Sequence, residues 1–398
     1  MEGNLIRINK KLLPLSWLYG IGVGFRNMLF ETGILKSKAY DVPVLLVGNI
    51  TVGGTGKTPH VEYLVRLLKD SCKVAVLSRG YKRKSRGFLL ATTETPMSQL
   101  GDEPYQMKRR FPDICVAVDK KRVHGIDTLL ANETTSNLDV IVLDDAFQHR
   151  YVKPGINILL VDHHRLIIND CLLPAGRLRE PLKNKDRADV VIVTKCPKTL
   201  TPMDFRVLTK QMDLYPYQKL FFTTLDYETL QPLFPEGKTL AGSKDNPMDS
   251  LTGVHVLLLT GIASPKQMLL DMEREAHAES ITPVTFADHH RFSKKDIRRI
   301  NDTFASLPAP RLIVTTEKDA ARLYDAKGLS EEVRRSIYAL PVKVRFMLDG
   351  EIMFNENIKN YVRKNSRNSI LAKSKDDHKP HHSDSAGDRP RTISFRNY

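Results

Sequence analysis

The 398-residue sequence has only four cysteines, one tryptophan and no apolar run long enough to span a membrane. No two cysteines form a C-x-x-C pair, which argues against a thiolate zinc site or a redox dithiol and fits a reducing cytosol. The N-terminal apolar stretch from Leu12 to Phe25 falls short of the roughly 20 residues that cross a bilayer. No small-residue cleavage site follows it closely. The sequence therefore predicts neither a membrane-spanning helix nor a cleavable signal peptide at this end.

The sequence has fewer acidic than basic residues: 46 Asp and Glu and 61 Lys and Arg, which gives a formal charge of +15. Such a charge attracts a polyanion, whether nucleic acid, phosphates or an anionic membrane. Much of the excess lies in residues 1–40 and 363–398, so the remainder of the chain has an ordinary bias. A hydrophobic content of 41% excludes wholesale disorder, and the length suggests two to three domains.

Continuous apolar runs punctuate the first half of the chain, as in strands buried on both faces of a parallel sheet. The runs are Val42–Gly48, Val74–Ser78, Asp139–Leu143, Asn157–Val161 and Asp189–Thr194. They alternate with helical segments. This alternation predicts a doubly wound parallel α/β domain over residues 41–219.

A second, smaller α/β domain is predicted over residues 220–362. Its expected strands are His255–Leu259, Ile281–Phe286 and Leu312–Thr316. We expect Leu220–Tyr227 to pair with Val342–Leu348 and Glu351–Phe354 as a short β hinge. Residues 363–398 are polar, basic and nearly free of large apolar side chains, which predicts a disordered tail.

The apolar stretch near the N-terminus is flanked by basic residues and contains Trp17 and Tyr19. Aromatic and basic residues in this arrangement are typical of segments that lie in the lipid headgroup zone. The alternative is a helix packed on the protein's own core. We expect residues 1–40 to form a membrane-associating helical segment.

The strongest chemical signal is the run GNITVGGTGKT from Gly48 to Thr58, which follows a predicted buried strand and opens a helix. In such a loop, backbone N–H groups hold phosphate oxygens, the lysine (Lys57) spans the β- and γ-phosphates, and the threonine hydroxyl (Thr58) ligates Mg²⁺. The first glycine of the G-x-x-x-x-G-K-[ST] pattern is replaced by Thr51. The alternative is a chance GKT in an ordinary loop.

A predicted strand ends in two carboxylates, Asp144 and Asp145, at the edge where ligands bind in such sheets. A carboxylate at this place can hold Mg²⁺ directly or through water. The alternative is a loop-capping role. Gln148 and His149 follow at the same edge.

Three other polar clusters fall in predicted loops. Asp102 and Glu103 in GDEP offer adjacent carboxylates or a plain helix cap. The segment LPAGRLREP (173–181) offers phosphate contacts or surface ion pairs, and Asp288-His289-His290 offers a metal site, a catalytic base or solvated histidines. Spacing alone does not choose between these interpretations.

Taken in order, these motifs resemble the tetraacyldisaccharide 4'-kinase family of lipid A (lipopolysaccharide) synthesis. The resemblance covers residues 12 to about 346 and rests on PLSWLYG, GNITVGGTGKTP, SRGY, GDEP, DDAFQHR, LPAGRLREP, DHH and TTEKD. It implies a P-loop kinase that uses ATP and Mg²⁺ to phosphorylate the 4'-hydroxyl of a tetraacyldisaccharide 1-phosphate. It also implies a peripheral enzyme on the cytoplasmic face of the bacterial inner membrane, without nucleic acid or an obligate protein partner. The family's usual glycine in DDGFQH is Ala146 here.

The resemblance also assigns roles to individual residues. Asp102 is implied as the general base, with His289 as its partner. The residues implied to bind ATP are Thr51, Val52, Gly53, Gly54, Thr55, Gly56, Lys57, Thr58, Arg122, His149 and Arg179. Those implied at the metal site are Thr58, Glu103, Asp144, Asp145, Gln148 and Glu180.

Two functions other than a kinase are compatible with parts of the sequence. A nucleotide-dependent metal chaperone or switch protein would share the phosphate-binding loop and could use His163-His164 and His289-His290, but it would need cysteine–histidine clusters that the sequence lacks. A nucleic-acid binder would fit the net charge. However, the basic residues are scattered or confined to the tail, and no nucleic-acid motif is present.

Overall fold

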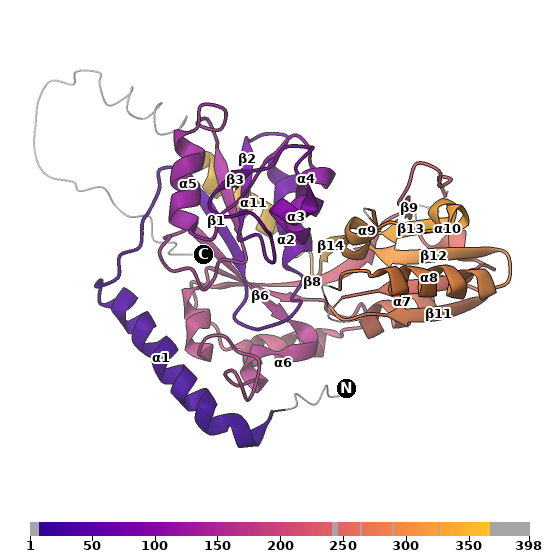
Figure 1. Ribbon diagram of the computed structural model, residues 1–398. Coiled ribbons are helices and arrows are strands. Elements are labelled where there is room, and N and C mark those ends of the chain that lie inside the picture. The colour runs from indigo at the N-terminus through magenta and orange to yellow at the C-terminus, as the bar shows by residue number, and fades with distance from the viewer. Residues whose placement is uncertain (1–7, 241–245, 263–264, 289, 325, 367–398) are drawn as a thin grey trace, which may run out of the picture. The chain divides into compact units, whose positions relative to one another are not determined.

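The computed structural model describes residues 8–240, 246–262, 265–288, 290–324 and 326–366. The chain divides into two compact units (Figure 1). One contains residues 1–79, 114–224 and 346–398, and the other contains residues 80–113 and 225–345. Segment 80–113, which we expected in the kinase domain over 41–219, therefore groups with the second unit.

The first unit is built on a parallel sheet. Seven of its strands lie in the order β8-β7-β6-β1-β5-β2-β4, and every neighbouring pair among them is parallel. These strands are β1 (Val44–Gly48), β2 (Val74–Ser78), β4 (Cys115–Val118), β5 (Val140–Asp144), β6 (Ile156–Asp162), β7 (Val190–Thr194) and β8 (Lys219–Tyr227). All residues of β1, β2, β5 and β7 are buried, which explains their unbroken apolar sequences.

One helix of the first unit, α1 (Leu13–Glu31), precedes the strands, and the others connect or follow them. These others are α2 (Lys57–Leu68), α5 (Arg122–Ala131), α6 (Pro202–Met212) and α11 (Gly350–Asn365), with short 3₁₀ turns at Lys10–Leu12, His163–Arg165, Ile167–Asn169 and Leu182–Arg187. The α2 residue Tyr63 donates to Asn355 Oδ1 of α11 at 2.8 Å, and its ring lies beside Phe354. The start of α6 is fixed by a capping box between Thr201 and Asp204.

The predicted hinge is partly reproduced. β14 (Val342–Phe346) lies next to β8 in the sheet order, and Met347 N–H donates to the Phe222 carbonyl at 2.9 Å. Residues Glu351–Phe354, which we expected as a hinge strand, belong instead to helix α11. The same helix continues through Asn365, so residues 363–365, which we expected in the disordered tail, are helical. Residues 367–398 of that tail lie outside the described part of the chain.

The second unit contains a sheet in the order β11-β10-β12-β13-β9. The strands of this sheet are β9 (Gln231–Pro232), β10 (His255–Thr260), β11 (Ser280–Thr285), β12 (Arg311–Thr316) and β13 (Ile337–Leu340), and the unit also contains the two-residue strand β3 (Leu89–Leu90). Its helices are α3 (Met97–Leu100), α4 (Asp102–Arg110), α7 (Pro265–Glu275), α8 (Lys294–Ser306), α9 (Glu317–Tyr324) and α10 (Glu331–Ser336), with a 3₁₀ turn at Asp249–Leu251. Alternate β10 residues belong to two different hydrophobic clusters, so both faces of this sheet are covered.

Helix α1, indigo in Figure 1, buries polar side chains and exposes large apolar ones. Its buried residues are Ser16, Asn27 and Phe30, whereas Trp17 and Ile21 are 70% and 69% exposed. Ser16 Oγ donates to the Leu172 carbonyl at 2.9 Å. The alternative that this segment packs its apolar face on the protein's own core does not match this pattern. Among the described residues, no helix is both long and apolar enough to cross a membrane.

Candidate active site

The loop from Asn49 to Gly56 connects β1 to α2 and forms the expected P-loop. Gly56, the residue before α2, has φ +80°, and Gly53 has φ +125°, two conformations that favour glycine. A Cβ atom at Gly48 would lie 2.7 Å from the Phe147 Cβ atom, so a larger residue does not fit there. The loop therefore has the backbone of a phosphate-binding turn at the amino end of a helix.

Thr51 can stand where the P-loop pattern has a glycine, because its backbone is extended. It forms an antiparallel bridge with Leu178. On either side of the bridge, Val52 N–H donates to the Arg177 carbonyl at 2.8 Å and Arg179 N–H donates to the Ile50 carbonyl at 2.7 Å. An extended residue needs no glycine, so the departure does not distort the loop.

Asp144 and Asp145 lie at the carboxyl end of β5, beside the P-loop strand β1. Asp145 Oδ1 lies 3.6 Å from Lys57 Nζ and 3.7 Å from an Arg179 nitrogen. Ser78 Oγ donates to Asp144 Oδ2 at 3.3 Å. The two carboxylates predicted from the strand pattern therefore lie next to the P-loop lysine and an arginine of the LPAGRLREP segment.

Arg122 reaches the same edge from the start of α5. Its guanidinium donates to the Asp144 carbonyl at 3.1 Å and to the Asp119 carbonyl at 2.8 Å, and the residue is only 2% exposed. Burial lowers the pKa of Arg122 to about 10, against the opposite effect of Asp144 and Asp145. Arg122 therefore remains a cation at neutral pH and holds the end of β5 through its backbone.

Two residues expected at the metal or nucleotide site instead contact the protein itself. Gln148 Nε2 donates to the Asn49 carbonyl at 2.6 Å. Glu180 is buried and pairs with Arg187, and it accepts a hydrogen bond from Asn184 at 3.0 Å. His149 lies in the same region, and burial followed by the positive charge of Arg122 lowers its pKa to about 4.

A hard cation would find oxygen donors at this edge. The Thr58 hydroxyl is buried and has no hydrogen-bond partner among the described residues. Asp144 and Asp145 supply carboxylates nearby in the fold. Within the described ranges no three His, Cys, Asp or Glu side chains cluster as a closed metal site. Mg²⁺ suits such a site, because its usual ligands in proteins are a few protein oxygens together with phosphates and waters.

Asp102 and Glu103 begin α4 in the second unit and have partners from α9. Asp102 Oδ2 accepts hydrogen bonds from Arg322 at 2.9 Å and 2.8 Å, and Glu103 accepts one from Lys318 at 2.6 Å. Arg322 also donates to the fully buried Asp319 at 2.8 Å. The implied partner of Asp102, His289, lies outside the described residues.

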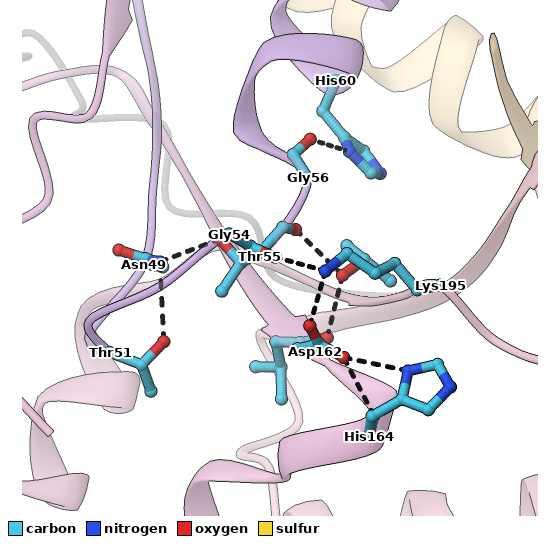
Figure 2. A network of polar contacts seen from close by, with 11 residues as sticks. Asn49, Thr51, Gly54, Thr55, Gly56, His60, Asp162, His164 and Lys195 are labelled. Atoms are coloured by element: carbon cyan, nitrogen blue, oxygen red, sulfur yellow. Dashed lines mark hydrogen bonds and ion pairs between the residues drawn. The ribbon is translucent and has the colours of Figure 1, made fainter. Parts of the chain in front are cut away.

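A group of polar residues around the P-loop was not predicted from the sequence (Figure 2). Asp162, Thr194 and Lys195 stand at the carboxyl ends of β6 and β7, and His60 lies in the first turns of α2. Hydrogen bonds from His164 and the Lys195 ammonium lower the pKa of Asp162 to about 2, although burial acts in the opposite direction. The strand-end rule that singled out Asp144 would have found Asp162 and Lys195 as well.

Known proteins of one family match this chain over nearly its whole length. The profile of the tetraacyldisaccharide-1-P 4'-kinase family matches residues 8–363. A tetraacyldisaccharide 4'-kinase of Phocaeicola vulgatus is 57% identical over 370 residues, which covers 93% of this chain and 99% of that protein. One from Bacteroides thetaiotaomicron is 50% identical over 381 residues, covering 95% and 100%.

A solved structure shares the fold. The crystal structure of LpxK from Aquifex aeolicus, described as a complex with ATP, matches with a TM-score of 0.67 and 30% identity over 88% of this chain and 98% of that one. The predicted doubly wound α/β fold of a P-loop kinase is thereby confirmed, and the chaperone and nucleic-acid alternatives lose their basis. The chain belongs to the tetraacyldisaccharide 4'-kinase family and is a phosphotransferase of lipid A biosynthesis.

Proposed function

We propose that this protein transfers the γ-phosphate of ATP to the 4'-hydroxyl of a tetraacyldisaccharide 1-phosphate with the help of Mg²⁺. The observation that carries the proposal is the P-loop with Lys57 and two carboxylates at the neighbouring strand end, in a chain related to 4'-kinases over almost its full length. The relative from Aquifex aeolicus is described in complex with ATP, which supports the choice of nucleotide.

The P-loop residues 51–58 would hold the phosphates. Phosphoryl transfer passes through a loose transition state, so positioning and charge neutralisation supply most of the rate enhancement. Lys57 and Arg179 lie 3.6 Å and 3.7 Å from Asp145 Oδ1, and both cations would be available to the oxygens of a phosphate bound at the loop. On binding, phosphate oxygens would replace the Asp145 carboxylate as the partner of both cations.

Mg²⁺ would be held by Thr58, Asp144 and Asp145, and it would neutralise charge on the transferring phosphate. The Thr58 hydroxyl, which is buried and has no partner within the described part of the chain, supports this assignment. Glu103, Gln148 and Glu180 remain candidates from the family resemblance. In the structure their partners include Lys318, the Asn49 carbonyl and Arg187, respectively.

Asp102 would accept the proton of the acceptor hydroxyl, with His289 as its partner. A carboxylate can do this late in a loose transition state, when the hydroxyl proton has become acidic. Arg322 contacts Oδ2 of the Asp102 carboxylate through two nitrogens, which fixes the orientation of the carboxylate.

The lipid substrate explains the exposed apolar face of α1. Each CH₂ of an acyl chain costs about 0.8 kcal/mol in water, so a lipid with four chains stays in its bilayer. The enzyme would therefore meet its substrate as a peripheral protein at the cytoplasmic face of the inner membrane. The exposed side chains of α1, Trp17 and Ile21 among them, support this attachment.

The test is transfer of label from [γ-³²P]ATP to a disaccharide 1-phosphate lipid in detergent micelles, with and without Mg²⁺. We expect labelled glycolipid only with Mg²⁺, and a loss of about 10²–10⁴-fold in turnover for Asp102→Ala because acid–base help is removed. Wild-type protein that forms no labelled lipid contradicts the reaction. A D102A variant within about threefold of wild type contradicts only the base assignment.

A further inference from the structure

Three consecutive carbonyl groups of the P-loop are bound by side chains from outside the loop (Figure 2). The pairs are Lys195 Nζ with the Gly54 oxygen, Thr194 Oγ1 with the Thr55 oxygen at 3.0 Å, and His60 Nδ1 with the Gly56 oxygen at 2.8 Å. The donors come from the end of β7 and from α2. We call Thr194, Lys195 and His60 the loop brace.

The lysine of the loop brace is itself held in place. Its ammonium lies 2.7 Å from Asp162 Oδ2, and the other oxygen of that carboxylate accepts the His164 N–H at 2.9 Å. Lys195 has φ +56°, a left-handed conformation that is rare for residues with a side chain. The backbone at the end of β7 is thus turned so that its side chain crosses to the P-loop, 141 residues away in sequence.

The histidine of the loop brace is fixed from its other side. A carbonyl oxygen only accepts, so Nδ1 carries the proton in the bond to Gly56. The other ring nitrogen, Nε2, lies 3.1 Å from the hydroxyl of Thr223, which is fully buried. The neutral ring therefore accepts from Thr223 and donates to the P-loop.

Fixing a carbonyl fixes the amide that follows it, because a peptide unit is planar and its C=O and N–H point in opposite directions. The three bound carbonyls belong to the peptide units whose N–H groups are those of Thr55, Gly56 and Lys57. With the oxygens held by the brace, these N–H groups point the other way. Successive N–H groups aligned in a loop before a helix form an anion-binding nest.

We propose that Lys195, Thr194 and His60 are positioning residues that preorganise the P-loop amides for a polyphosphate. They do not touch the reacting atoms. The proposal deepens the proposed function, since it concerns the loop assigned to ATP. Its expected effect falls on phosphate binding, because a loop that must order itself on binding loses affinity.

A lysine elsewhere in the same unit offers a matched control. Lys185 is buried, and its ammonium donates to the Asp213 carbonyl and lies 3.8 Å from an Asp186 oxygen. It thus resembles Lys195 in having one carbonyl and one carboxylate as partners, but neither partner belongs to the P-loop. Lys185→Met reports the cost of removing such a lysine without disturbing the nest.

Two histidine variants separate the two bonds of the ring. The side-chain amide of asparagine can donate from about the place of Nδ1, whereas that of glutamine lies near Nε2. His60→Asn therefore retains the bond to Gly56, and His60→Gln retains a contact with Thr223 in its place. If His60 only packed against its neighbours, phosphate binding would not depend on which of the two variants keeps the bond to Gly56.

The experiment measures the KM for ATP, kcat, the thermal midpoint and the Kd of tripolyphosphate by calorimetry, all on the full chain. For Lys195→Met we expect KM and the tripolyphosphate Kd to rise about tenfold, and for H60Q about fivefold. We expect H60N and K185M to remain within about twofold of wild type in both constants. K185M should lower the thermal midpoint as much as K195M does.

Tripolyphosphate offers phosphates without a nucleoside or an acceptor, so it tests the loop brace even where no glycolipid is labelled. The proposal is overturned if K195M binds tripolyphosphate within twofold of wild type. It is equally overturned if K185M weakens binding as much as K195M. A wild type that binds tripolyphosphate but labels no lipid refutes the proposed reaction and leaves the brace to be decided by the binding constants.

Discussion

Replacing the apolar face of α1 should release the protein from membranes without unfolding it. The variant W17Q/L18Q/I21Q changes three side chains that are 70%, 67% and 69% exposed. Glutamine is a good helix former, so the helix itself should persist. Because the three side chains contribute little to the folded core, we expect the thermal midpoint to change by no more than a few degrees.

The expected loss of binding follows from the exposed fractions. Full burial of a large apolar side chain contributes about 1.5–3 kcal/mol, so side chains that are two-thirds exposed have about 1–2 kcal/mol each still to gain in lipid. Three of them contribute about 3–6 kcal/mol, which is at least a hundredfold in the partition coefficient since about 1.4 kcal/mol is tenfold. The KM for lipid in the kinase assay should rise, whereas the KM for ATP should not.

The assay is co-sedimentation with sucrose-loaded vesicles of phosphatidylethanolamine and phosphatidylglycerol. The control is M203Q/V207Q on α6, where two apolar side chains are 66% and 39% exposed but lie outside α1. We expect the control to sediment like wild type. If the α1 variant also does so, or if the control is lost equally, α1 is not the docking surface.

Two further predictions concern buried polar groups of the first unit. Thr58→Val should reduce turnover at least about a hundredfold with no loss of thermal stability, because the hydroxyl it removes is buried and has no hydrogen-bond partner in the described ranges. A large fall in the thermal midpoint would contradict the metal assignment. Asp162 has a pKa of about 2 in the fold and an ordinary value of 3.8, so its contribution of about 2 kcal/mol is present above pH 4 and is lost as the pH falls toward 2. Asp162→Asn should therefore lower the free energy of unfolding at pH 7 and flatten its decline between pH 4 and 2, as measured by urea titration; an unchanged pH dependence would show that the carboxylate is not held as described.

The central strands were predictable because a strand buried on both faces has an unbroken apolar sequence. The predicted Val74–Ser78 coincides with β2, and Asp139–Leu143 differs from β5 by one residue at each end. Cys115–Val118 was missed as a strand because four residues carry too little pattern. Glu351–Phe354 was wrongly read as a strand because a short apolar segment does not distinguish strand from helix, and the 16-residue helix α11 contains it.

The candidate site was predictable only as far as local motifs reach. The P-loop and the Asp144–Asp145 pair follow from strand ends, since parallel strands bring their carboxyl ends to one edge. The partners of these groups do not follow, because contacts such as Lys195 with Gly54 join residues 141 positions apart. Arg322, which holds Asp102, is separated from it by 220 residues.

The replacement of a P-loop glycine by Thr51 shows how tertiary context decides what a motif requires. The segment around Leu178 pairs with Thr51 and keeps it extended, so left-handed backbone is confined to Gly53 and Gly56. The same segment is held on its other side by α1, since Ser16 Oγ accepts the Ala175 N–H at 2.9 Å. The resemblance assigns Arg179 of LPAGRLREP to ATP, and the backbone of the same segment pairs with the loop through Arg177 and Leu178. A pattern search that demands glycine at position 51 would miss the loop, whereas the strand that precedes it and the helix that follows identify it from the fold.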